Sequence, residues 1–261
     1  MNVPRAGALA EERVARYLRE RDYSFQVEPD FGTGRHPDYL ITAGEHTIVA
    51  EVKAFETYGM FENAVLGQVM ARSLEDALPP IRKQIKKAAG QLRGLRDRGW
   101  PLVVVLDNPA GRPIPFDSHM VLSAMYGDLA LQAPLEPDGV LGEFRAVAGR
   151  NGSLRNDHPY ISAVAVVRRE DHAALWAADW FEAHRADFGP AGAEESGQAT
   201  KAMVAAFAEA SKDAPEGDDI YLEVFETLSA TSVPLPRDVF NGPRDRRWIP
   251  NAARTALVPL A

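Results

Sequence analysis

Two short apolar segments with charged residues at fixed places constrain the fold of this chain most. These segments are His36–Ile41 and Ile48–Lys53. Because side chains alternate between the two faces of a β-strand, Glu51 and Lys53 should project from the same face. A tight turn through Ala43–His46 would join the segments into a hairpin and bring Asp38 alongside Glu51. The pattern therefore predicts two carboxylates and one ammonium together at a sheet edge.

Oxygen ligands of this kind suit a hard cation such as Mg²⁺ or Mn²⁺. We expect the side chains of Asp38 and Glu51, with the main-chain carbonyl of Val52, to hold the ion. Lys53 would orient a water molecule and stabilise developing negative charge. The alternative is an exposed edge strand whose charges only prevent unwanted strand pairing.

The order Pro37-Asp38, a spacer of twelve residues and Glu51-Val52-Lys53 resembles the signature of the PD-(D/E)xK nuclease superfamily. The context supports the resemblance, because Lys53 is the first lysine of a chain that otherwise uses mostly arginine. The resemblance implies an α/β fold with an αβββαβ restriction-endonuclease-like core and a mixed sheet. It also implies a magnesium-dependent endonuclease.

The remaining segments of the first part of the chain fit that order of elements. Apolar spacing predicts a helix over residues 6–21, a strand over 23–28, a helix over 80–98 and a strand over 102–106. An insertion at 54–79 should contain a short helix over 64–78, and its aromatic residues either pack or stack on bases. We therefore expect a nuclease-like core in residues 1–107.

The resemblance also implies two supporting residues. A glutamate of the first helix often leans over the site in this superfamily, and Glu11 fits that place better than Glu12. A glutamate near a helix start can equally be a solvated residue that complements the helix dipole. A glutamine on the helix after the acid-x-lysine strand often supports the site, and Gln84 fits better than the alternative Gln91.

The helix expected over residues 80–98 carries seven basic residues and one acidic residue, in a chain whose net charge is −8. A surface this basic on an acidic protein is a candidate for phosphate binding. The alternative is a solvated helix face or contact with an acidic partner protein. The residues that we predict to contact nucleic acid are Arg82, Lys83, Lys86, Lys87 and Arg93.

Residues 108–261 resemble no family that we can name. Their apolar segments predict a helix near 119–126 and strands at 160–167 and 221–225, the first of which could extend the same sheet. We expect an α+β extension. The chain has no cysteine, no apolar run long enough for a membrane span and no signal-peptide core, so we expect a cytoplasmic protein without membrane contact.

These observations predict a metal-dependent nuclease that hydrolyses phosphodiester bonds, in defence or repair. DNA is favoured over RNA because it is the commoner substrate of the superfamily. A homodimer is compatible with these expectations. The alternative is a nucleic-acid- or partner-binding module that keeps the fold without cleaving.

Overall fold

The computed structural model describes residues 5–55, 74–108, 117–127, 129–135, 139–142, 145–148, 151–154, 157–184, 208–209, 212 and 217–260. Most of the insertion predicted at 54–79 lies outside these ranges, including Tyr58 and Phe61 and the first ten residues of the helix predicted over 64–78. The chain forms two compact units, one of residues 1–167 with 222–261 and one of residues 168–221.

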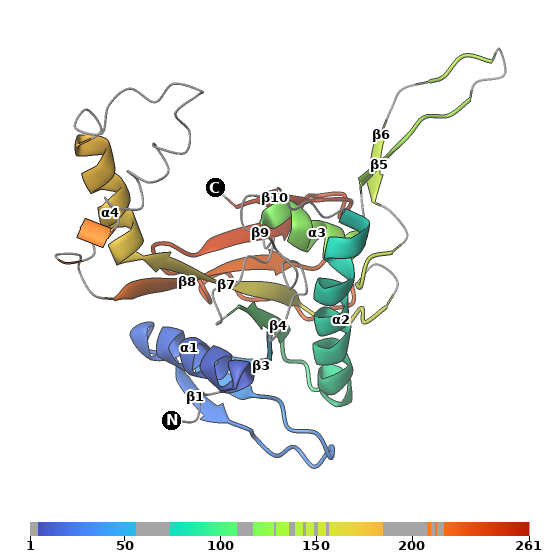
Figure 1. The fold of residues 1–261 in the computed structure, drawn as a ribbon. Helices are drawn as coiled ribbons and strands as arrows, with labels where there is room; N and C mark the ends of the chain where they lie inside the picture. The colour runs from blue at the N-terminus through green and yellow to red at the C-terminus, as the bar shows by residue number, and fades with distance from the viewer. Residues whose placement is uncertain are drawn as a thin grey trace. The chain divides into compact units, whose positions relative to one another are not determined.

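An eight-stranded mixed sheet organises the fold, in the strand order β1-β2-β3-β4-β7-β8-β9-β10 (Figure 1). The strands are β1 (Ser24–Val27), β2 (Tyr39–Ala43), β3 (His46–Ala54), β4 (Leu102–Asp107), β7 (Ala163–Asp171), β8 (Asp218–Glu226), β9 (Arg246–Pro250) and β10 (Leu257–Pro259). Strands β1, β2 and β3 pair antiparallel in sequence order, whereas β3, β4 and β7 are parallel. The protein is therefore α/β with a mixed sheet, as predicted.

The hairpin predicted from the sequence is present between β2 and β3. Ala43 pairs with His46, so two residues form the turn, and Gly44 takes a φ of 58° that a side chain would disfavour. The register pairs Tyr39 with Ala50. Asp38, one residue earlier, therefore lies beside Glu51, as the sequence predicts.

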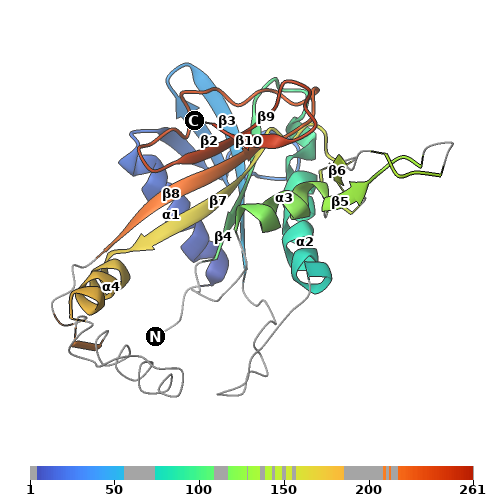
Figure 2. The same cartoon turned by 90° about the horizontal axis from the view of Figure 1, so that it is seen from above.

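Helices cover both faces of this sheet (Figures 1 and 2). They are α1 (Ala6–Glu20), α2 (Leu74–Leu92) and α3 (Ser118–Tyr126). The apolar stripe of α2 packs with α3 and the sheet in one buried cluster, which includes Ile81, Ile85, Val49 and Val104. Alternate residues of β3, such as Ile48 and Ala50, are fully buried outside that cluster, on the face toward α1.

The second helix differs from its prediction at both ends. We expected it to begin at Pro80 and to end near Arg98, but α2 already includes Leu74 and ends at Leu92, followed by a 3₁₀ turn at Arg93–Leu95. Pro79 and Pro80 lie inside the helix, where each removes a backbone donor. The neighbouring residues Ala77, Leu78 and Ile81 are buried in the core cluster, so packing outweighs the local preference of proline.

The sheet continues well beyond residue 107, the boundary expected from the sequence. The strand predicted at 160–167 is β7, and its first residues pair with β4, from Val103 with Ala163 to Leu106 with Val166. The compact units accordingly do not divide the chain at 107. This continuation agrees with the expectation that the segment at 160–167 could extend the same sheet.

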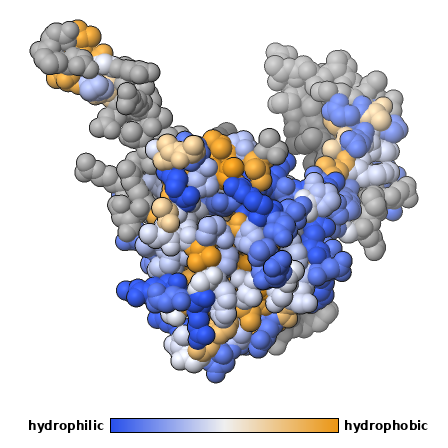
Figure 3. Space-filling view, turned by 180° about the vertical axis from the view of Figure 1, so that it is seen from behind, coloured by the Kyte–Doolittle hydropathy of each residue, from blue (hydrophilic) through white to orange (hydrophobic). Residues whose placement is uncertain are grey.

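A separate two-stranded sheet consists of β5 (Leu129–Gln132) and β6 (Arg145–Ala148). The unit of residues 168–221 contains α4 (His172–Ala183), where the side chain of Asp171 accepts a hydrogen bond from the amide of Ala174. On the face in Figure 3, the apolar residues form small patches separated by hydrophilic ones.

The side chain of Asp245 connects α1 to the C-terminal part of the chain through hydrogen bonds. Asp245 accepts hydrogen bonds from Tyr17 Oη at 2.5 Å, from Gly242 N at 2.7 Å and from Leu222 N at 2.7 Å. Tyr17 is fully buried, and burial, followed by the charge of Asp245, raises the pKa of its hydroxyl, which therefore remains a donor.

We expect Tyr17→Phe to lower the free energy of unfolding by about 1.5 kcal/mol, because it removes one buried hydrogen bond to a charged group. Urea unfolding at neutral pH would measure the change. An unchanged midpoint would mean that Asp245 does not stabilise the packing of α1.

Candidate metal and nucleic-acid site

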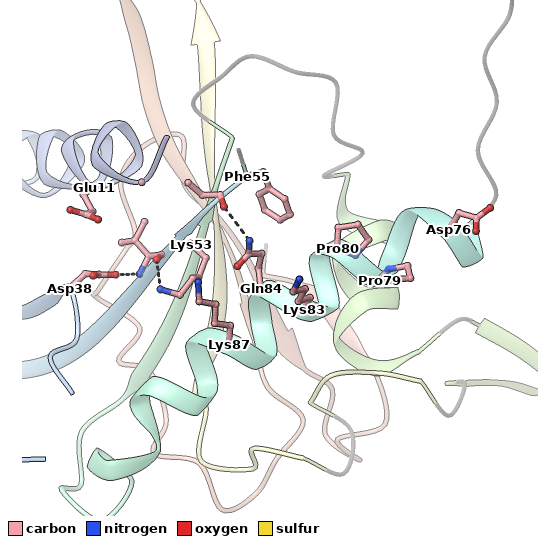
Figure 4. A pocket seen from close by; sticks show the side chains of 13 residues that line it. Glu11, Asp38, Lys53, Phe55, Asp76, Pro79, Pro80, Lys83, Gln84 and Lys87 are labelled. Atoms are coloured by element: carbon pink, nitrogen blue, oxygen red, sulfur yellow. Dashed lines mark hydrogen bonds between the residues drawn. The ribbon is translucent and has the colours of Figure 1, made fainter. Parts of the chain in front are cut away.

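A cavity of about 770 Å³ lies where the end of β3 meets α1 and the first half of α2 (Figure 4). The residues with charged or amide side chains that line it include Glu11, Asp38, Lys53, Lys83, Gln84 and Lys87. All six were selected from the sequence. The fold therefore brings together residues that are as many as 76 positions apart in the chain.

Asp38 is fixed by the neighbouring strand. Its Oδ2 atom accepts a hydrogen bond from the backbone amide of Val52 at 2.6 Å. Burial raises the pKa of Asp38, while this amide and the ammonium of Lys53 act in the opposite direction. A partly desolvated carboxylate at this position gains more from a cation than an exposed one would.

Glu51 is fully buried, and its two oxygens differ in their hydrogen bonds. Oε1 accepts a hydrogen bond from the ammonium of Lys53, whereas the buried Oε2 has no hydrogen-bond partner in the described part of the chain. Burial and, after it, the charge of Asp38 raise the pKa of Glu51 to about 7. An unsatisfied buried oxygen next to a second carboxylate is a costly arrangement for the folded protein alone, and a bound cation would relieve it.

The ammonium of Lys53 contacts two of the oxygens that the sequence analysis assigns to a metal. Its Nζ contacts Glu51 Oε1 and the carbonyl oxygen of Val52, the latter at 3.0 Å. The ammonium therefore occupies the position that a cation bound to these two oxygens would take.

Glu11 faces the same cavity from α1. Tyr39 donates its hydroxyl hydrogen to the carbonyl of Glu11 at 2.7 Å, which ties this turn of the helix to β2. Burial raises the pKa of Glu11, followed by the charges of Asp38 and Glu28. Glu12 instead is exposed and pairs with Arg19 at 3.0 Å, so the structure places Glu11 rather than Glu12 at the cavity.

Within the described ranges, no three histidine or acidic side chains converge closely enough to form a metal site by themselves. The candidate ligand set is thus two carboxylates and one main-chain carbonyl, those of Asp38, Glu51 and Val52. Its chemistry suits Mg²⁺ or Mn²⁺, which retain water ligands and bind through few protein carboxylates. Glu51 Oε2 is buried and has no hydrogen-bond partner among the described residues, which indicates that the set fits such an ion.

The helix α2 contributes a supporting amide and two cations. Gln84 donates a hydrogen bond to the carbonyl of Ala54 at 3.3 Å, which holds the end of β3. The exposed Lys83 and Lys87 lie one helical turn apart on the same wall (Figure 4). Gln91, the alternative from the sequence, does not line this cavity.

The other basic residues predicted on this helix have different surroundings. Arg82 is half-buried and donates to the carbonyl of Ser123 at 3.3 Å, so it connects α2 to α3. Lys86 lies 3.9 Å from Asp157. Arg93 is exposed and faces a separate cavity beyond the end of α2. A further cavity of about 590 Å³ is lined by Arg82, Lys83 and Lys86. The five basic residues are thus spread over three cavities rather than gathered at one site.

Sequence reasoning missed Asp76 and left Phe55 between a packing role and stacking on bases. Both line the cavity, although Phe55 is also buried in the core. Asp76 precedes Lys83 by seven residues and Lys87 by eleven, a spacing that places all three on one helix face. That signal was hidden by the expectation that a helix ends before Pro79 and Pro80.

Comparisons with models of known protein families, with curated proteins and with solved structures found no match. No helix in the described ranges has the length and apolar composition that a membrane crossing needs.

Proposed function

We propose that this protein is a metal-dependent nuclease that hydrolyses phosphodiester bonds, with DNA as the expected substrate. The observation that carries the proposal is the cluster of Asp38, Glu51 and Lys53 beside a cavity with lysines on its opposite wall. The order α1, three antiparallel strands, α2 and a parallel β4 supports assignment to a restriction-endonuclease-like core.

Each residue would have a separate part in the reaction. Asp38, Glu51 and the carbonyl of Val52 would hold the ion, which when bound polarises phosphoryl oxygens and lowers the pKa of a coordinated water. As an ammonium, Lys53 would donate hydrogen bonds to the attacking water and to the phosphoryl oxygens, which carry the negative charge that develops in the transition state. Glu11 would bind a metal-coordinated water from the side of α1.

The lysines of α2 would position the substrate. Lys83 and Lys87 are separated by one turn, about 6 Å along the helix. They would neutralise phosphates next to the bond that is cleaved. Gln84, through its contact with Ala54, would keep α2 and the end of β3 in register.

We expect Asp38→Asn to lower Mg²⁺- or Mn²⁺-dependent cleavage of plasmid and oligonucleotide substrates about a hundredfold. Asparagine can still accept the hydrogen bond from Val52 N, so the variant removes charge more than structure. The matched control is Asp30→Asn, at an exposed aspartate that accepts a backbone hydrogen bond from Gly32 at 2.8 Å. Cleavage by gel assay, with and without chelator, is the measurement.

Equal cleavage by the two aspartate variants, or cleavage that persists in chelator, would contradict the proposal. DNA that is bound but cleaved with neither ion would instead favour a non-cleaving binding module.

A further inference from the structure

A second cavity, of about 440 Å³, lies beyond the end of α2 and is separate in its lining from the candidate metal site. Its lining includes Arg93, Arg96, His158, Tyr160 and Thr231, together with the carboxylates of Asp97 and Asp157. None of these residues has a part in the proposed hydrolysis.

A chain of hydrogen bonds fixes the histidine of this cavity. Tyr160 donates its hydroxyl hydrogen to the carbonyl of Ala89 at 2.9 Å, so its oxygen can only accept from His158 Nδ1, also at 2.9 Å. Nδ1 of His158 therefore carries the hydrogen. Burial lowers the pKa of His158, with Arg93 and Lys86 contributing in the same direction and Asp157 opposing them.

The backbone at His158 is strained. Its φ of 55° lies in the left-handed region, which costs a residue with a side chain roughly 1 kcal/mol or more. Contacts on the following residues hold the turn, since Ile161 N donates to the carbonyl of His158 at 3.1 Å and Ser229 Oγ to that of Pro159 at 2.7 Å. These contacts hold the histidine at the rim of the cavity in a single backbone conformation.

The two arginines are exposed and little engaged. The guanidinium of Arg96 pairs with the adjacent Asp97, at 3.3 Å and in an exposed pair. The guanidinium of Arg93 is exposed and forms no ion pair or hydrogen bond within the described residues. Both lie close enough to Tyr160 to lower the pKa of its hydroxyl, against the larger effect of burial. The two guanidinium groups line the same cavity as the Tyr–His pair, and its two carboxylates are each paired with a cation, Asp97 with Arg96 and Asp157 with Lys86. Arginine binds phosphate oxygens with two parallel donors, so this surface suits a phosphate.

We propose that this cavity, formed by Arg93, Arg96, His158 and Tyr160, binds a phosphate ester of the nucleic acid at a distance from the bond that is cleaved. This inference rests on the proposed function. Arg93, the first residue after α2, follows Lys83 by ten residues, which span about 15 Å at the rise of an α-helix. At 3.4 Å for each nucleotide of a B-form strand, the cavity holds the phosphate some four to five nucleotides away. That phosphate is either part of the backbone or a terminal 5′-phosphate.

The test measures binding without metal, so that it does not depend on cleavage. Fluorescence anisotropy with a labelled 30-base-pair duplex in chelator, across 50–200 mM salt, would compare Arg93→Ala/Arg96→Ala with the matched control Arg16→Ala/Arg19→Ala on α1. We expect the first pair to weaken binding about tenfold or more at 100 mM salt and to reduce the slope of log affinity against log salt by about 1.8. The control should change neither value by a comparable amount.

Two further arms identify the source of the phosphate. Short duplexes with a 5′-phosphate or a 5′-hydroxyl would differ in affinity only if the terminal group enters the cavity, and Arg93→Lys/Arg96→Lys should then remove the difference while keeping the charge. Equal affinities, with the loss in the alanine variant retained, would assign a backbone phosphate.

The inference is overturned if both alanine pairs bind like the unaltered protein, if they weaken binding equally, or if the unaltered protein fails to bind DNA at 50 mM salt. Cleavage by a protein whose Arg93→Ala/Arg96→Ala variant binds normally would leave the proposed function intact. If the variant binds DNA more weakly but the unaltered protein never cleaves DNA, the phosphate-binding inference stands and the proposed nuclease function fails.

Discussion

Lys53→Ala should bind Mn²⁺ about tenfold more tightly than the unaltered protein and cleave DNA about a thousandfold more slowly. The two changes have one cause. The ammonium of Lys53 lies on Glu51 Oε1 and the carbonyl of Val52, so it competes with a metal for the same oxygens. The same ammonium would serve the reaction as a hydrogen-bond donor once the metal is bound.

The size of the affinity change follows from electrostatics. Two unit charges 4 Å apart interact by about 4 kcal/mol at an effective dielectric constant of 20. Rearrangement of the lysine when the ion enters would remove much of that repulsion, and about 1.4 kcal/mol corresponds to the tenfold change. Loss of one donor to the transition state typically costs 10²–10³ in rate.

Isothermal titration with Mn²⁺ and a cleavage assay on the same preparations would measure both effects. Lys53→Arg keeps the charge and is expected to bind Mn²⁺ with little change, yet to cleave poorly because its planar donors have a different geometry. Lys212→Ala is the control for loss of an exposed lysine. A Lys53→Ala protein that binds Mn²⁺ no better than the control would show that Lys53 does not occupy the metal position.

The local part of the site could be predicted from the sequence because it depends on strand alternation and one short turn. Asp38, Glu51 and Lys53 fall within one hairpin, and the period of a strand determines which of them share a face. The buried face of α2 could equally be predicted from its apolar spacing, and the buried residues Ile81 and Ile85 confirm it.

Other features depend on packing between distant segments. The missing partner of Glu51 Oε2 follows from burial by other elements of the fold, and no local pattern reports it. The passage of α2 through Pro79 and Pro80 shows tertiary packing overriding a local rule. The cavity at His158 joins residues of the α2 end to a loop more than sixty positions later, and its histidine is marked only by a backbone angle.

The buried carboxylate also makes a prediction about stability. We expect Glu51→Gln to raise the free energy of unfolding in chelator at pH 8 by about 2 kcal/mol. Burial raises the pKa of Glu51 from 4.5 to about 7, so the folded protein binds this proton more tightly than the unfolded chain. That shift corresponds to about 3 kcal/mol, and the cost of burying an unpaired amide hydrogen reduces the gain.

The sign of the pH dependence follows from the same linkage. Below pH 4.5 Glu51 is protonated in both states and imposes no penalty, whereas above pH 7 the folded state must hold a buried carboxylate. The advantage of Glu51→Gln should therefore grow between pH 4.5 and 7 and then remain constant. Glu12→Gln is the control, because the exposed Glu12 has a pKa lowered by Arg19 and the substitution should produce no gain at pH 8.

Metal ions should reverse this order of stability. Mn²⁺ binds the carboxylate form of the unaltered site and stabilises the folded state by mass action, while glutamine offers only a weak ligand. Urea unfolding at pH 8 is thus expected to rank Glu51→Gln above the unaltered protein in chelator and below it in millimolar Mn²⁺. If Mn²⁺ raised both proteins equally, Glu51 would be a buried carboxylate with a structural cost and no role as a ligand. A reversal would show that the folded state keeps a destabilising charge at this position because an ion requires it.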